Sequence, residues 1–109
     1  MRKRVICDEN LPHKLRTLIP EHDLFSVAYM QWVGIKNGEL LDVAERAHFD
    51  VLITSDQGIP HQQNMAERRL AVVLLPTPDW NVVQHQSRRI LAAIELSVPG
   101  TFTRVEFGT

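Results

Sequence analysis

The most constraining feature of this sequence is a continuous apolar run from Leu70 to Leu75. Such a run, with no polar residue alternating, is typical of a strand in a parallel sheet that is buried on both faces. Further short runs predict strands at Arg4 to Cys7, Leu24 to Ala28 and Asp50 to Thr54. The segment Phe102 to Phe107 alternates between apolar and polar residues, which predicts an edge strand.

Helical patterns separate the predicted strands. A helix is expected soon after Pro12, because proline has no N–H to leave unpaired in a first turn. From Gly38 to Ala47 the apolar residues share one helical face, and Asn37 is a suitable N-cap. A short helix is expected from Gln62 to Arg69, and a long one from Trp80 to Val98. This alternation predicts an α/β fold, with a mostly parallel sheet of about five strands and helices on both faces.

Length and composition restrict the class of protein. A chain of 109 residues with 44% hydrophobic residues is predicted to form a single domain, 1–109, around one core. Its net charge of −1 excludes binding of nucleic acid by charge alone, so such binding needs a local patch, a metal or an oligomer. No apolar stretch suits a transmembrane helix or a signal peptide, so we expect a cytoplasmic protein without membrane association.

Acidic residues follow two of the predicted strands. Asp8 and Glu9 come directly after the first strand, and Asp56 follows the third. In an open parallel sheet, ligands bind beyond the carboxyl ends of the strands, where the strand order reverses. If the first strand lies between the second and third, Asp8 and Asp56 are neighbours at that point. Glu39 begins the helix that leads into the third strand, so it is expected at the same edge.

Carboxylates gathered at one edge repel one another unless a cation lies between them. Mg²⁺ and Mn²⁺ prefer carboxylate oxygens, and such a metal can activate water and stabilise charge on a phosphate. The sequence therefore predicts a metal site formed by Asp8, Glu39 and Asp56. Each acid also has a simpler interpretation. Asp8 could cap a turn, Glu39 could favour the helix dipole, and Asp56 could form an Asx-turn.

Other polar residues give weaker signals. Cys7 is interpreted as a buried strand residue, because it lies within an apolar run. The arginine pairs at 68–69 and 88–89 are interpreted as solvated faces, with phosphate contact as the alternative. Gln62, Gln63 and Asn64 lie just past Asp56, where they either line the same pocket or solvate the start of a helix.

Several segments together resemble the small PIN-like proteins, a mostly bacterial family. They are Asp8-Glu9-Asn10-Leu11-Pro12, Asn37-Gly38-Glu39-Leu40-Leu41 and Phe49-Asp50-Val51-Leu52-Ile53-Thr54-Ser55-Asp56. Gln62-Gln63-Asn64 is also similar to the family pattern. The resemblance extends from Val5 to Leu75, and more loosely through the last predicted helix.

The resemblance implies a three-layer PIN-like fold and a Mg²⁺- or Mn²⁺-dependent ribonuclease, in which a metal-held water attacks an RNA phosphodiester in line. It implies that Asp8, Glu39 and Asp56 are the catalytic, metal-holding acids. It further implies a homodimer with two sites along one groove, and the toxin of a toxin–antitoxin pair, with an antitoxin protein as partner. Substrate contacts or support for the acids are expected from Glu9, Asn10, Asn37, Gln63 and Asn64.

Two other classes of protein fit part of the pattern. A non-catalytic interaction module is one, because Gln57-Gly58 stands where many PIN-like proteins carry another acid. A phosphoacceptor receiver domain is the other, since it also has an acid pair after its first strand and an aspartate after its third. Receivers, however, need a lysine after the last strand, and the lysines of this chain are Lys3, Lys14 and Lys36.

Overall fold

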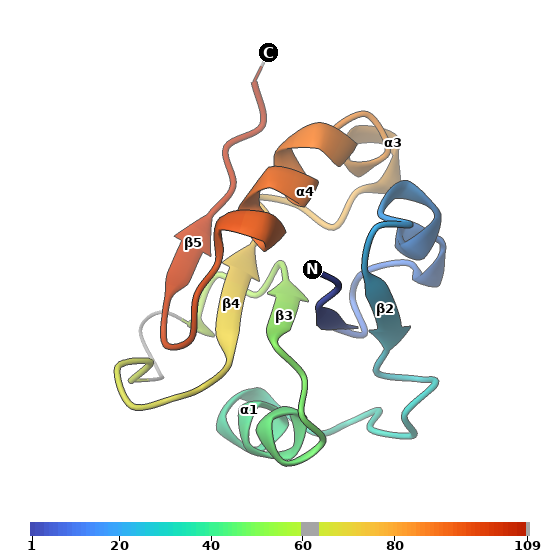
Figure 1. Cartoon of the computed structure of the whole chain (residues 1–109). Helices are drawn as coiled ribbons and strands as arrows, with labels where there is room; N and C mark the ends of the chain where they lie inside the picture. The colour runs from blue at the N-terminus through green and yellow to red at the C-terminus, as the bar shows by residue number, and fades with distance from the viewer. Residues whose placement is uncertain (60–63, 109) are drawn as a thin grey trace.

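The sheet has the strand order that brings the first and third strands together. A computed structural model describes residues 1–59 and 64–108. Within these residues the chain forms one five-stranded sheet in the order β2-β1-β3-β4-β5, with every neighbouring pair parallel. Figure 1 shows β3, β4 and β5 side by side. The strands are β1 (Arg4–Cys7), β2 (Asp23–Ser26), β3 (Val51–Thr54), β4 (Ala71–Leu74) and β5 (Phe102–Arg104).

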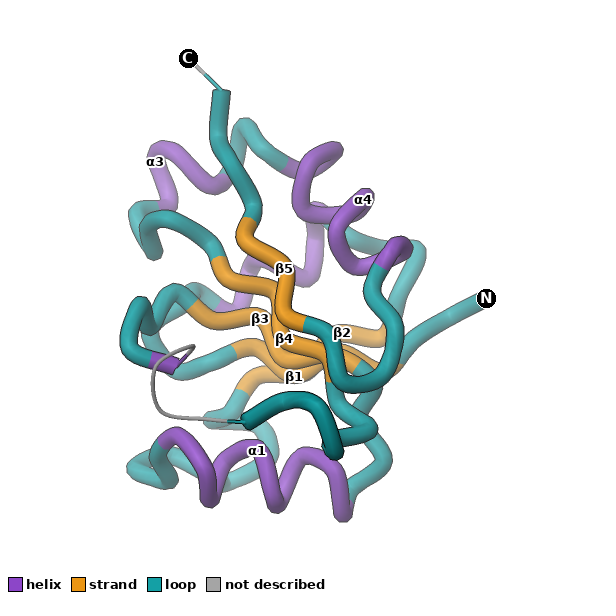
Figure 2. Tube along the Cα trace, turned by 90° about the vertical axis from the view of Figure 1, so that its left-hand side faces the viewer, coloured by secondary structure: helices purple, strands orange, loops and turns teal. Residues whose placement is uncertain are grey.

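Helices cover both faces of the sheet, so the fold has three layers (Figure 2). One face packs against the 3-10 helix η1 (His13–Leu18) and the helices α3 (Trp80–Val83) and α4 (Ser87–Leu96). The opposite face packs against α1 (Asn37–Arg46). The predicted class, an α/β fold with a parallel sheet between helices, is confirmed.

The strands divide their side chains between two hydrophobic cores. In β1, Val5 and Cys7 enter the core under α4, whereas Ile6 enters the core under α1. The two central positions of β3, Leu52 and Ile53, divide in the same way, and both are 0% exposed. Burying both faces removes the need for polar residues in a strand, which explains the continuous apolar run at β4. Each fully buried aliphatic side chain contributes roughly 1.5–3 kcal/mol to this packing.

The last predicted helix is interrupted. The segment expected to be helical from Trp80 to Val98 forms α3 and α4 instead of one helix. Between them the N–H groups of His85 and Gln86 donate to carbonyl oxygens three residues earlier, at 3.2 and 2.9 Å. Such tight, 3-10-type bonds end α3 and let the chain turn before α4 begins.

The prediction of a short helix from Gln62 to Arg69 is wrong for the part that the structure describes, because residues 64–69 are not helical and contain a turn at 66–67. The side-chain oxygen of Asn64 accepts a hydrogen bond from the backbone N–H of Ala66 at 3.0 Å, in competition with helical bonding. The N–H of Arg68 then donates to the carbonyl of Met65 at 3.0 Å. Gln62 lies outside the described residues.

The strand bounds differ from those predicted by only a few residues. The predicted second strand, Leu24 to Ala28, is β2 and ends at Ser26. The hydroxyl of Ser26 accepts a hydrogen bond from the N–H of Tyr29 at 3.0 Å, which starts a turn at the carboxyl edge of the sheet. In residues 1–59 and 64–108, no helix has the length and apolar character needed to cross a membrane.

Candidate functional site

A cavity lies where β1 and β3 end and α1 begins. Its volume is about 330 Å³, and its lining residues are Asp8, Glu9, Asn10, Ile35, Lys36, Leu40 and Asp56. β1 pairs with β2 on one side and with β3 on the other, so the strand order reverses between β1 and β3. The cavity therefore occupies the place at which open parallel sheets bind their ligands.

Thr54 holds the two aspartates of the cavity together. Its hydroxyl donates a hydrogen bond to Oδ2 of Asp8 at 2.7 Å and accepts one from the backbone N–H of Asp56 at 3.0 Å. The Thr54 side chain is fully buried at the last position of β3, whereas both aspartates are half-buried. A buried hydroxyl with both its donor and an acceptor site in use has a fixed orientation, so Thr54 fixes Asp8 relative to the backbone of Asp56.

Each aspartate also stabilises its own turn. Oδ1 of Asp8 accepts the N–H of Glu9 at 2.8 Å, and Oδ1 of Asp56 accepts the N–H of Gly58 at 2.9 Å. These contacts match the simpler interpretations of the two residues as turn formers. A carboxylate has two oxygens with about four acceptor positions, so both groups keep capacity for a further ligand. Structural and ligand-binding roles are therefore compatible at Asp8 and Asp56.

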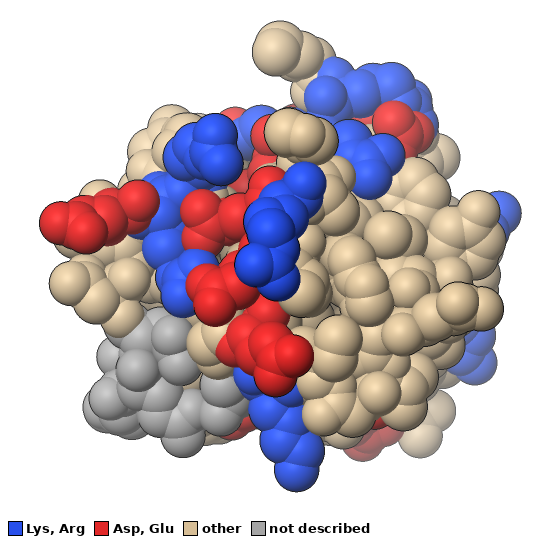
Figure 3. All heavy atoms as spheres, turned by 90° about the horizontal axis from the view of Figure 1, so that it is seen from below, with Lys and Arg blue, Asp and Glu red and all other residues tan. Residues whose placement is uncertain are grey.

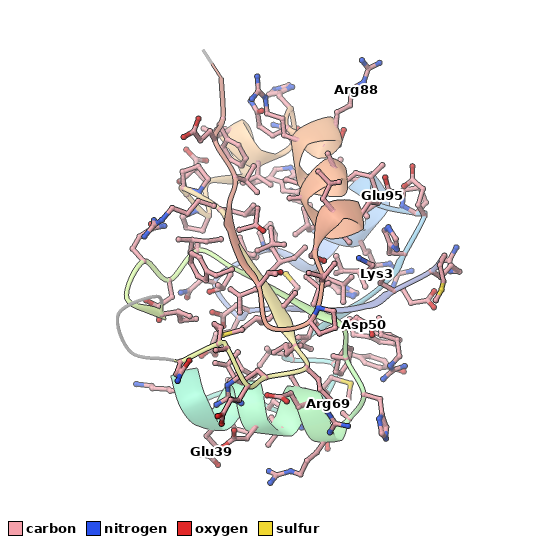
Figure 4. The ribbon with its side chains drawn as sticks, turned by 60° about the vertical axis from the view of Figure 1, so that its left-hand side comes forward. Lys3, Glu39, Asp50, Arg69, Arg88 and Glu95 are labelled. Carbon is pink, nitrogen blue, oxygen red and sulfur yellow. The ribbon has the colours of Figure 1, made fainter. Side chains whose placement is uncertain are left out.

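Glu39 takes a different position from the cavity acids. It lies exposed in the first turn of α1, and the cavity is lined from this segment by Lys36 and Leu40 instead. In Figure 4 the labelled Glu39 projects from the side of α1 that faces away from the sheet. No group of three or more histidine, cysteine, aspartate or glutamate side chains is placed to hold a metal within residues 1–59 and 64–108. The metal site therefore remains a prediction.

The other candidate residues are divided among different places. Glu9 and Asn10 line the cavity with Asp8. Asn37 is the first residue of α1. Asn64 is exposed and lines a separate hollow with residues of α1 and with Arg68. Gln63 lies outside the described residues.

Arg68 is an anchor between a loop and α1, and not part of a solvated face. Its guanidinium donates hydrogen bonds to Oδ1 of Asp42 at 2.8 Å and to Oε1 of Glu45 at 2.6 Å. Burial acts to lower the pKa of Arg68, but the hydrogen bonds to Glu45 and Asp42 outweigh it and the pKa is raised. Figure 3, which views the α1 side, shows acidic and basic side chains interleaved in one band. Two acids of α1 are thus engaged in holding the loop.

The second arginine pair lies far from the cavity, on α4. Arg88 extends into solvent, as expected for a solvated face (Figure 4). Arg89 is also exposed and donates a hydrogen bond to the carbonyl of Glu106 at 3.1 Å. The basic residue that lies beside the acids is instead Lys36, which sequence reasoning passed over.

Sequence reasoning also missed Thr54. Its signal is a hydroxyl at the last position of an otherwise apolar strand, two residues before an aspartate. Comparisons of this chain with protein-family models, curated proteins and solved structures gave no match.

Proposed function

We propose that this protein is a Mg²⁺- or Mn²⁺-dependent nuclease that hydrolyses RNA phosphodiesters. The observation that carries the proposal is the hydrogen-bonded unit of Asp8, Thr54 and Asp56 at the switch point of the sheet. RNA as the substrate, and an antitoxin and a homodimer as assemblies, come from the resemblance to PIN-like proteins.

The donor set of the cavity fits a hard divalent cation. Its polar side chains are carboxylates, an amide and an ammonium group, and none of its lining residues within 1–59 and 64–108 is a histidine or a cysteine. Oxygen-only ligands favour Mg²⁺ and Mn²⁺ over zinc or copper. Asp8 and Asp56 would hold the cation through carboxylate oxygens that keep acceptor positions. When bound, the cation would supply an activated water and stabilise charge on the phosphate.

The chain's own residues would prepare this site before a ligand arrives. Thr54 holds the Asp8 carboxylate through its hydroxyl, so the carboxylate does not have to be ordered on binding. Glu9 is a third carboxylate at the cavity, and Glu39 is the acid that the resemblance assigns. Glu9 lines the cavity itself, whereas Glu39 lies directly before the lining residue Leu40 in α1.

The test is degradation of fluorescently labelled single-stranded RNA with Mn²⁺ or Mg²⁺. The variants are Asp8→Asn and Asp56→Asn, with Asp79→Asn as the matched control. Asp79 is exposed, caps α3 through its side chain and lies outside the cavity, and asparagine caps a helix equally well. We expect metal-dependent cleavage that both cavity variants abolish and that Asp79→Asn leaves unchanged. Cleavage that survives in both cavity variants would mean a contaminating ribonuclease.

An interaction module without catalytic activity is the alternative outcome. It predicts no cleavage by the wild-type protein and no rise in melting temperature when Mn²⁺ is added. If the protein is a nuclease, it should cleave RNA, and Mn²⁺ should raise its melting temperature. A ligand that binds only the folded protein stabilises it by mass action. At a Mn²⁺ concentration of about 100 times Kd, the stabilisation is about 2.7 kcal/mol.

A further inference from the structure

The cavity has one basic side chain among its acids. Lys36 lines it together with the carboxylates of Asp8, Glu9 and Asp56, and no other lysine or arginine is among the lining residues that the structure describes. Lys36 immediately precedes α1 and is exposed. The cavity thus presents a cationic group directly beside the acids that are proposed to hold a metal.

The other two lysines of the chain have roles inside the protein. The ammonium of Lys3 donates hydrogen bonds to the carbonyl oxygens of Ile94 and Ser97, both at 2.8 Å, and so caps the end of α4. The ammonium of Lys14 lies 4.7 Å from the centre of the Trp80 ring, in a cation–π contact. Among the side chains that the structure describes, Lys36 forms no ion pair.

We propose that Lys36 binds the phosphate of the RNA substrate beside the metal, an inference that rests on the proposed function. A phosphodiester carries a negative charge, and acids alone would repel it. A cationic side chain at the wall of the same cavity offsets the repulsion between the carboxylates and the phosphate. The acids and Lys36 therefore form the two halves of one site, the acids for the divalent cation and the ammonium for a phosphate oxygen.

This role predicts that replacing Lys36 lowers the affinity for RNA without lowering the affinity for Mn²⁺. Replacing Lys36 by glutamine removes a positive charge near the metal, so Mn²⁺ affinity should stay the same or rise by roughly two- to fivefold, as expected for one exposed charge pair. RNA affinity should fall severalfold. A variant that merely disturbs the fold would weaken both ligands.

The salt dependence of RNA binding gives a second readout. For single-stranded nucleic acid, the slope of log Kobs against log salt concentration is about −0.7 per phosphate contact. Lys36→Gln should therefore reduce the magnitude of this slope by about 0.7, while Lys36→Arg should restore it. The control is Arg46→Gln, which removes one positive charge from the last turn of α1, outside the cavity.

The experiment measures the fluorescence anisotropy of a short labelled single-stranded RNA, with Ca²⁺ replacing Mn²⁺ and RNA integrity checked on a gel. Mn²⁺ affinity is taken from thermal shifts of the same proteins. A smaller slope for Lys36→Gln, a normal slope for Lys36→Arg and Arg46→Gln, and undiminished Mn²⁺ affinity would support the proposal. A wild-type slope for Lys36→Gln, or a loss of Mn²⁺ affinity together with RNA affinity, would overturn it.

These outcomes separate the phosphate proposal from the nuclease proposal. If the wild-type protein cleaves RNA and Lys36→Gln behaves like Arg46→Gln, the nuclease stands and Lys36 has no phosphate role. If the wild-type protein binds neither Mn²⁺ nor RNA, both proposals fail together.

Discussion

Replacing Thr54 with valine tests whether the two aspartates of the cavity are held as one unit. Valine has nearly the shape of threonine and suits a strand, so the change removes the hydroxyl with little change in packing. Two hydrogen bonds are lost, the one to Oδ2 of Asp8 at 2.7 Å and the one from the N–H of Asp56 at 3.0 Å. The side chain is 0% exposed, so bulk solvent does not reach the hydroxyl.

The cost of this substitution can be worked out from the two bonds. A hydrogen bond to a charged group contributes about 1.5–3 kcal/mol, and a neutral one about 0.5–1.5 kcal/mol. Asp8 is half-buried, so water can reach its carboxylate from the cavity side, and this keeps the loss near the lower end of the range. We expect Thr54→Val to lower the free energy of unfolding by about 2–3 kcal/mol. In a domain of this size, that change lowers Tm by roughly 10–20 °C.

The assay is urea unfolding combined with Mn²⁺ titration, and it includes two further variants. Thr54→Ser keeps the hydroxyl and loses only a methyl group, so it should retain Mn²⁺ affinity even where stability falls by about 1 kcal/mol. Thr103→Val, in the edge strand β5, removes a half-buried hydroxyl far from the cavity and should have little effect. If Thr54→Val is as stable as the wild type and binds Mn²⁺ equally well, the hydroxyl does not organise the site.

Three further outcomes follow from single residues. Gly100 has φ +79°, and a Cβ there would lie 3.1 Å from the carbonyl oxygen of Met65, whereas at Gly34 (φ +89°) no atom lies within 4 Å of such a Cβ. Gly34→Ala therefore carries only the backbone strain of about 1–2 kcal/mol, and Gly100→Ala should lower the urea midpoint by more. Burial, and then the charge of Asp8, raise the pKa of Cys7 from 9.0 to about 12, so the thiol should react with a disulfide reagent at pH 8 only after unfolding. The stability that this shift contributes is present below pH 9 and is lost as pH rises towards 12. If the exposed position of Glu39 persists when metal binds, Glu39→Gln should change Mn²⁺ affinity less than Glu9→Gln does, which isothermal titration can measure.

The sheet was predictable because its determinants are local. A strand buried on both faces must be apolar throughout, and the run at β4 shows this directly in the sequence. Helical periodicity also located α1 to within a residue. The break between α3 and α4 was not predictable in the same way, because the buried residues Val83 and Ile90 keep the same spacing in one helix as in two. Hydrophobic periodicity is insensitive to a turn of this kind.

The neighbouring positions of Asp8 and Asp56 were likewise a consequence of topology. Both follow strands, and strand order alone brings the ends of β1 and β3 together. The contact that joins them was not predictable from the same reasoning. Whether the hydroxyl of Thr54 points to Asp8 or into the core depends on the register between β1 and β3, in which Cys7 pairs with Ile53. Register is a tertiary property, so the pattern of either strand alone does not contain it.

The third acid shows where sequence reasoning stops. The prediction that Glu39 lies at the carboxyl edge required only that α1 begins at that edge. α1 does begin there, because Lys36 and Leu40 line the cavity. The rotation of α1 about its own axis decides which of its first residues faces the cavity. Successive residues differ by about 100° around a helix, so burying Leu40 in the core turns Glu39 towards solvent. The same rotation leaves Lys36 at the cavity. A sequence pattern that identifies acids by their position along the chain cannot show that Lys36, and not Glu39, lines the cavity.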